Sequence, residues 1–364
     1  MPHTNIRSLA ANDFEVADKI LVGIKKYQST FGSAVLPSPT KVDFEIKFNN
    51  WNVFEKLYPY YLLVGFILLV VLFVKVLSAN LSLKWLINAL SILIFIGFLA
   101  HTIGLGIRWY ISGHAPWSNG YEATIYIGWA GLLAGFVFRK KSPMTLAVTA
   151  VLGGIILFVA HLSFLDPQIT NLVPVLKSYW LTIHVSAITA SYGFMALGAL
   201  LAFVNLITMI FKTTKNQLRL SLSIKELTYV IEMTLTIGLV LLSIGNFLGG
   251  VWANESWGRY WGWDPKETWA LASIIFYAFV LHMRFIPGLK SIYTFNFSAL
   301  VAFASIIMTF FGVNYYLSGL HSYAAGDPVP IPTFVYYSIA VIAIISLVAY
   351  WRNSKFENEN KADN

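Results

Sequence analysis

The chain contains no cysteine among its 364 residues. It therefore forms no disulfide, binds no metal through thiolates and performs no thiol chemistry with its own side chains. Any thiol that takes part in its reaction must belong to a partner.

Charged residues are also scarce. They make up 12% of the chain, whereas hydrophobic residues make up 57%, and a soluble domain has about 25% charged residues. The formal net charge of +8 would suit a nucleic-acid-binding protein. The basic residues, however, lie in short runs between apolar segments and form no single patch. The composition excludes an ordinary soluble domain and favours a chain that lies mostly in lipid.

Long apolar runs dominate what is present. A helix that crosses a bilayer of about 30 Å needs about 20 mostly apolar residues. Runs of this kind have approximate cores at Tyr60–Ala79, Trp85–Ile107, Tyr121–Phe138, Thr145–Phe164, Trp180–Phe211, Thr228–Gly250, Glu267–Phe285, Phe297–Leu317 and Phe334–Trp351. The sequence predicts an all-α integral membrane protein with about nine transmembrane helices.

Lysine and arginine orient these spans, because cytoplasmic loops are enriched in them. With the N-terminus outside and the C-terminus inside, the cytoplasmic side receives Lys75, Lys84, Arg139, Lys140, Lys141, Lys212, Lys215, Arg219, Lys225, Arg284, Lys290, Arg352, Lys355 and Lys361. The outer loops between spans keep Arg108, Lys177, Arg259 and Lys266. The imbalance predicts that the N-terminus is extracytoplasmic.

Three parts follow from this topology. Residues 1–57 form an extracytoplasmic soluble segment, residues 58–352 a transmembrane domain, and residues 353–364 a cytoplasmic tail. No signal peptide precedes the soluble segment, because the first long apolar run begins near Tyr60. Either the segment is translocated unaided, or the chain is the C-terminal part of a longer polypeptide; we favour the second interpretation.

The outer loop between the sixth and seventh spans is rich in tryptophan. Its aromatic and glycine residues are Trp252, Trp257, Gly258, Tyr260, Trp261, Gly262, Trp263 and Trp269. An aromatic belt that only positions helix ends would explain one or two tryptophans. Belts need no glycines between the aromatic residues, whereas glycine lets a backbone lie close to a large planar ligand. We therefore interpret the loop as a ligand platform.

The end of this loop has the pattern of a helix start. Asp264 suits the N-cap, Pro265 the first helical position, and Glu267 the third position, from which it completes a capping box. The positive end of the helix dipole, together with Lys266 and Arg259, would attract anionic groups. Ordinary capping explains the same residues whether or not a ligand binds.

The segment Trp257–Trp269 resembles the tryptophan-rich WWD signature of haem-handling proteins in cytochrome c biogenesis, and the wider chain resembles the CcsA (ResC) family. The segments His114–Glu122, Trp180–Ser186 and Gly319–Tyr323 resemble family positions in the same order. The N-terminal segment is similar to the soluble stretch that precedes this domain in fused CcsB–CcsA proteins. The likeness covers most of residues 100–325.

This resemblance implies a function. The protein would deliver haem b across the bacterial cytoplasmic membrane and present it outside for covalent attachment to an apocytochrome c that carries a Cys-x-x-Cys-His motif. It would be a component of a system II cytochrome c synthase with a CcsB/ResB-type membrane partner. No catalytic residue is assigned, and the implied haem-binding residues are His184, His321, His282, Trp257, Trp261, Trp263, Asp264 and Trp269.

Histidine is a common axial ligand of haem iron, and depth in the membrane separates the histidines. His184 and His321 lie near the outer ends of their spans, and the resemblance implies that they ligate the external haem. His282 lies about 27 Å deeper, at about 1.5 Å per residue from Asp264. The resemblance makes it a ligand of an inner haem, opposite a histidine of the partner.

The roles of the other transmembrane-region histidines, His101, His114 and His161, stay open between structural and substrate-contacting. His101 and His114 do not share a helix, because Gly113 and Pro116 place His114 in a loop. Two other classes of protein remain as alternatives. A b-type electron-transfer cytochrome needs paired histidines on the same helices, and a solute transporter leaves the tryptophan-rich loop unexplained.

Overall fold

The structure is a computed structural model that describes residues 6–7, 10–77, 82–162, 165–170, 177–317, 319 and 330–362, with side chains up to residue 354. The chain divides into two compact units, Met1–Trp51 and Asn52–Asn364. The first unit contains helices α2 (Phe14–Phe31) and α3 (Pro39–Trp51). The Asp13 side chain caps α2 by accepting a hydrogen bond from the backbone N–H of Val16 at 3.2 Å.

The second unit is built from long helices. They are α4 (Val53–Leu77), α5 (Lys84–Ser112), α6 (Gly120–Phe138), α7 (Pro143–His161), α8 (Tyr179–Ile210), α9 (Gln217–Trp257), α10 (Pro265–His282), α11 (Ile292–Ile307), α12 (Val313–Tyr316) and α13 (Thr333–Ala362). A short 3₁₀ turn, η2 (Met283–Phe285), follows α10, and a π-helical turn, η3 (Met308–Gly312), joins α11 to α12.

The predicted fold class is confirmed. Within the described ranges, nine helical segments are long and apolar enough to cross a membrane, and none of the described residues forms a strand. Several helices extend well beyond their predicted apolar cores: α4 already begins at Val53, α5 continues past Ile107 to Ser112, α9 runs from Gln217 to Trp257, and α13 continues past Trp351 to Ala362. The apolar run reports only the part of a helix at lipid depth, since polar residues continue the same backbone hydrogen bonds beyond it.

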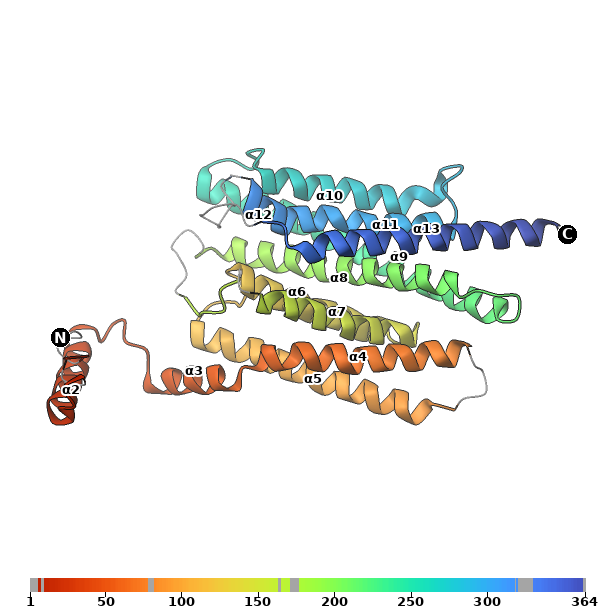
Figure 1. Cartoon of the computed structure of the whole chain (residues 1–364). Coiled ribbons are helices and arrows are strands. Elements are labelled where there is room, and N and C mark those ends of the chain that lie inside the picture. The colour runs from red at the N-terminus through yellow and green to blue at the C-terminus, as the bar shows by residue number, and fades with distance from the viewer. Residues whose placement is uncertain are drawn as a thin grey trace. The chain divides into compact units, whose positions relative to one another are not determined.

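Helices of the second unit lie side by side with roughly parallel axes (Figure 1). Helix α8 packs against α9, α6, α11 and α13, whereas α4 packs against α7 and α5. Glycines permit the close approach of α4 and α7: a Cβ added to Gly65 would lie 2.7 Å from the backbone N of Val151, and one added to Gly154 would lie 2.8 Å from the backbone N of Leu62. Small residues at such crossings are typical of packed membrane helices.

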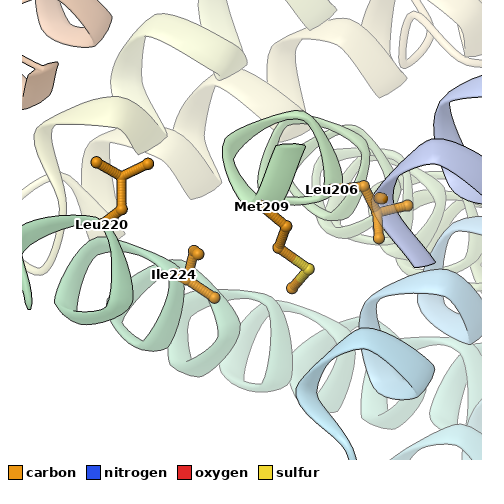
Figure 2. Packing of buried hydrophobic residues seen from close by; sticks show 5 residues of the cluster. Leu206, Met209, Leu220 and Ile224 are labelled. Carbon is orange, nitrogen blue, oxygen red and sulfur yellow. The ribbon is translucent and has the colours of Figure 1, made fainter. Parts of the chain in front are cut away.

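An apolar cluster and a polar cluster hold α8 and α9 together away from the tryptophan-rich loop. Figure 2 shows Leu206 and Met209 of α8 beside Leu220 and Ile224 of α9. Nearby, the Asn205 side-chain amide donates to the Oγ1 of Thr228 at 3.0 Å and to the Oδ1 of Asn296 on α11 at 2.9 Å. Side-chain hydrogen bonds between helices replace the contacts that lipid cannot supply.

The loop between α5 and α6 and the tryptophan-rich segment between α9 and α10 lie at the same end of the second unit. We call it the cavity end, because the cavity described below opens there. Helices α5, α7 and α9 finish there, and α6, α8 and α10 begin there, so His184 and the tryptophan-rich segment share this end. His282 closes α10, whose 18 residues span about 27 Å. It therefore lies at the opposite end, as the sequence predicts.

Candidate functional site

A cavity of about 680 Å³ opens at the cavity end. One side, which we call the loop wall, consists of lining residues from the segments 114–123 and 165–170. The other side, the helix wall, comes from α8, the end of α9, the start of α10, η3 and α12, together with Tyr260 and Trp261 of the tryptophan-rich segment. Segments far apart in the sequence thus enclose one space of ligand size.

His184 lines this cavity from the second turn of α8. Its Nδ1 lies 2.7 Å from the carbonyl oxygen of Gly245 on α9. A carbonyl oxygen only accepts hydrogen bonds, so Nδ1 carries the proton and the lone pair of the neutral ring is on Nε2. A carbonyl that orients the imidazole in this way is the usual support of a metal-ligating histidine.

The imidazole fits closely against α9. A Cβ on Gly249 would lie 2.5 Å from Cε1 and 2.7 Å from Nδ1 of His184, so the ring occupies the space that any other residue would need. Behind it the Trp252 ring stacks at a centroid distance of 6.4 Å and an interplanar angle of 13°. Trp252 in turn contacts Trp257 edge-on at 4.7 Å. Two tryptophans therefore support the histidine from within the protein.

The start of α10 has the predicted cap. The Oδ1 of Asp264 accepts from the backbone N–H of Lys266 at 2.9 Å, and the Oε2 of Glu267 accepts from the backbone N–H groups of Gly262 and Asp264 at 2.8 and 3.3 Å. Asp264 is 6% exposed and makes the N-cap. The Lys266 side chain lines the cavity, where its Nζ donates to Oδ1 of Asn314 at 2.8 Å.

The π-helical turn η3 forms part of the helix wall. Thr309, Phe310 and Phe311 of this turn line the cavity. The Thr309 hydroxyl donates to the carbonyl of Ser305 at 2.7 Å and lies 3.3 Å from the hydroxyl of Ser273 on α10. Such turns insert an extra residue into a helix and are frequent at functional sites. No pattern in the sequence predicts this turn.

The four tryptophans predicted to bind a ligand lie in different surroundings. Trp261 lines the cavity, and Trp257 packs behind His184 through Trp252. Trp263 is 72% exposed, has a left-handed backbone with φ of 55°, and meets Trp261 edge-on at 5.8 Å. Trp269 is partly buried on α10 and is not among the residues that line the cavity.

The two glycines of this segment differ in their surroundings. Gly258 ends α9 in the left-handed conformation at φ of 70°, which residues with a Cβ adopt rarely. A Cβ on Gly262 would lie 3.1 to 3.2 Å from the Arg259 guanidinium. Close approach to a planar ligand is therefore not needed to explain Gly258.

The remaining histidines differ in position and in surroundings. His321 lies outside the described residues. His282 is exposed beside η2, and its Nδ1 donates to the carbonyl of Ala278 at 2.6 Å, which assigns the lone pair of the neutral ring to Nε2. His101 is fully buried in α5 with Nε2 against the Ile125 carbonyl.

His114 lies in a loop, as predicted, and lines the cavity, with Nδ1 3.1 Å from the Ala115 carbonyl and Nε2 3.2 Å from that of Thr170. His161 ends α7, 3.4 Å from a carboxylate oxygen of Glu55 and stacked on Tyr58. Among the histidines that the structure describes, His114 and His184 line the cavity.

Sequence reasoning misses a buried charged pair beside the cavity. It assigns Arg108 to an outer loop because the apolar run ends at Ile107. The structure places this residue inside α5, 2% exposed and 2.8 Å from Glu122. An ionisable residue directly after an apolar run was the available signal, since charges at membrane depth are rare and usually functional.

The fold and the site define an all-α membrane protein with a histidine-lined cavity at one end. A family model described as "Cytochrome C assembly protein" matches residues 117–321. These residues include the helix wall and most of the loop wall, and they make up more than half of the chain, so the protein belongs to this family. Family membership places it in cytochrome c biogenesis.

Named relatives agree with this membership. Protein NrfI of Wolinella succinogenes is 47% identical over 329 residues, which cover 90% of this chain and 36% of the relative. Cytochrome c biogenesis protein CcsA of Prochlorococcus marinus (strain MIT 9303) is 34% identical over 268 residues, 64% of this chain and 83% of the relative. CcsA of Guillardia theta is 36% identical over 248 residues, 61% of this chain and 81% of the relative. The chain thus spans most of the CcsA proteins but about a third of NrfI.

Proposed function

We propose that the protein delivers haem b across the membrane and holds it in the cavity for covalent attachment to an apocytochrome c, as in system II maturation. The observation that carries this proposal is the geometry of His184: a cavity-lining imidazole with Nδ1 hydrogen-bonded to Gly245 and its ligating nitrogen assigned to Nε2. Neutral imidazole nitrogen is a strong ligand for haem iron.

The chemistry of the lining suits haem. Aromatic and aliphatic side chains such as Phe310, Trp261 and Ile188 provide apolar surface for a large planar ring. Lys266 and the N-terminus of α10 provide positive potential for propionate carboxylates. His321, as the second iron ligand, and Trp263, as a stacking surface at the exposed rim, complete the proposed outer site.

Attachment itself needs little from this chain. A thiol of the acceptor adds across a vinyl group of haem: the sulfur bonds to one vinyl carbon, the thiol hydrogen passes to the other, and no atom is lost. The chain has no cysteine to compete for the vinyl groups. Its contribution is positional, since holding both reactants in place removes most of the entropic cost of a bimolecular step.

Entry of haem is assigned to the opposite end. We propose that His282, exposed at the end of α10, ligates haem arriving from the cytoplasm, and that a CcsB/ResB-type partner supplies the facing histidine. The cavity end is then extracytoplasmic. The loop cations that support this orientation, Arg139, Lys140 and Lys141, lie between α6 and α7 at the end opposite the cavity.

An optical spectrum of the purified protein tests the outer site. His184→Ala should lose haem or shift it toward a five-coordinate spectrum, and added imidazole should partly restore ligation by occupying the space of the missing ring. His161→Ala is the matched control, because it also removes an imidazole near the cavity end but does not line the cavity. Equal haem content and identical spectra in both variants would refute the assignment.

The alternative of a b-type electron-transfer cytochrome gains no support from the structure. Such proteins hold haem between histidines paired on the same helices, and within the described ranges α5, α7, α8 and α10 carry one histidine each. His101 and His114 are separated by the end of α5 at Gly113. We therefore propose that haem is the cargo of this protein and not a fixed electron carrier.

A further inference from the structure

A buried ion pair joins the ends of α5 and α6 next to the cavity. The Arg108 Nε donates to the Oε1 of Glu122 at 2.8 Å, and the two side chains are 2% and 1% exposed. Two charges in such a place cost several kcal/mol of desolvation each unless their other hydrogen-bonding atoms are also satisfied. The hydrogen-bond partners of the remaining Arg108 and Glu122 atoms indicate the role of the pair.

The remaining donors and acceptors of the pair bind both segments of the loop wall. Arg108 donates from Nη1 to the carbonyl of Pro167 at 2.8 Å and from Nη2 to that of Gln168 at 3.0 Å. The Oε2 of Glu122 accepts from the backbone N–H and the hydroxyl of Ser118 at 2.8 and 2.7 Å. One planar guanidinium thus holds two consecutive carbonyls and a carboxylate at once, a geometry that a lysine ammonium does not reproduce.

Two further contacts hold residues 165–170 against residues 114–123, the other segment of the loop wall. The His114 ring lies 3.2 Å from the Thr170 carbonyl. A Cβ on Gly120 would lie 3.1 Å from a methyl group of Leu165, so this leucine packs on the first turn of α6. Residues 165–170 contain no helix or strand, and they line the cavity through Leu165 and Gln168 among others. Side-chain hydrogen bonds therefore decide where this segment lies.

We propose that Arg108 and Glu122 are positioning residues of the haem cavity: they hold the two segments of the loop wall to each other and to α5, and so set how tightly the cavity retains its ligand. This inference rests on the proposed function for the identity of the ligand, haem, but not for the closure of the wall. Neither residue lines the cavity, and both act through the backbone groups of residues 118, 167 and 168.

A purely stabilising ion pair is the competing explanation, and a double substitution separates the two. Removing one partner leaves an unpaired buried charge, whereas replacing both with neutral groups of similar size is often harmless to stability. The double variant Arg108→Met/Glu122→Gln removes both charges. The amide introduced at position 122 still presents an oxygen to Ser118, while the carbonyls of Pro167 and Gln168 lose their donor. The variant should therefore fold but have a loosened wall.

The chain has no cysteine, so one introduced thiol reports on the cavity without background. Thr189→Cys places the thiol in the cavity wall on α8, where Thr189 is 4% exposed. Thr208→Cys is the matched control: it lies on the same helix, is 1% exposed, makes the same hydrogen bond to the carbonyl four residues earlier, and does not line the cavity. The rate of maleimide labelling is measured on purified full-length protein in detergent, which removes any dependence on topology.

In the double variant, the thiol at position 189 should react about tenfold faster or more, which corresponds to about 1.4 kcal/mol, and the thiol at position 208 should react at its original rate. Haem b loaded on the same protein should dissociate faster by a similar factor, while its spectrum keeps the ligands of the original protein. Arg108→Lys, which retains the charge but not the planar fork, should give an intermediate rate and serves if the double variant does not accumulate.

Unchanged labelling at position 189 would overturn the inference, and so would equal acceleration at both positions, because that result means global loosening. Faster labelling at position 189 alone, in a protein that binds no haem in any background, would support the positioning role and refute the proposed function. The labelling and haem measurements therefore fail independently.

Discussion

Replacing Gly249 with alanine should disable the outer site although no proposed ligand is substituted. The added Cβ would lie 2.5 Å from Cε1 and 2.7 Å from Nδ1 of His184. Since normal contacts between carbon atoms are about 3.5–4.0 Å, the imidazole must move by about 1 Å. That movement strains the 2.7 Å hydrogen bond from Nδ1 to Gly245 and tilts Nε2 away from its ligating direction.

A displacement of about 1 Å at a reacting centre typically costs about a hundredfold in efficiency. We therefore expect haem retention and attachment activity in Gly249→Ala to fall by about that factor, close to the effect of His184→Ala. The preference of a helix for alanine over glycine, about 1 kcal/mol, offsets part of the cost of the crowded contact, so the protein should still fold. Haem ligation should therefore fall far more than stability.

The assay is haem content and optical spectrum of the purified protein, together with its thermal unfolding. Gly106→Ala is the matched control, since Gly106 also lies inside a helix and a Cβ there meets nothing within 4 Å. If Gly249→Ala keeps the original spectrum and haem content, the ring of His184 is not held as the structure shows, and the reasoning about its ligating nitrogen is wrong.

Other predictions concern the orientation of the chain in the membrane, the entry of haem at His282 and the role of the exposed Trp263. An impermeant maleimide applied to intact cells should label Glu255→Cys at the cavity end and should leave Lys140→Cys unlabelled until the membrane is permeabilised; the reverse pattern would invert the proposed orientation. Haem counted per protein should rise from one to two when a CcsB-type partner is co-expressed, and His282→Ala should abolish the second haem; an unchanged count in that variant would show that His282 is not the inner ligand. Trp263→Ala should speed haem loss severalfold with no change in ligation, because it removes stacking surface at the rim and no iron bond; a changed Soret position would contradict this role.

Local patterns along the chain were enough to predict the membrane spans and some of the helix ends. Apolar runs locate spans because each span must satisfy its own backbone in lipid. The Asp264 cap and the termination at Gly113 were predictable for a similar reason, since both depend on residues within a few positions of one another. The shared position of His184 and the tryptophan-rich segment also followed, because alternating spans bring alternate loops to one side.

Contacts between distant segments were not predictable in this way. The tryptophan-rich segment reads as one platform in the sequence, yet Trp261 lines the cavity, Trp257 supports Trp252 behind His184, and Trp263 is exposed. Side-chain direction at each position depends on the left-handed turns at Gly258 and Trp263. Composition and spacing carry no signal for such turns at a non-glycine residue.

The sequence by itself determined the class of the protein, its spans and the chemical types at its site, because hydropathy and helix capping are local properties. Tertiary structure alone decided which nitrogen of His184 carries the lone pair, why Gly249 is glycine, and how Arg108 reaches across 59 residues to hold the loop wall. Each of these depends on a hydrogen bond or a contact between helices. Such contacts are set by packing over the whole bundle, which no single segment of the chain encodes.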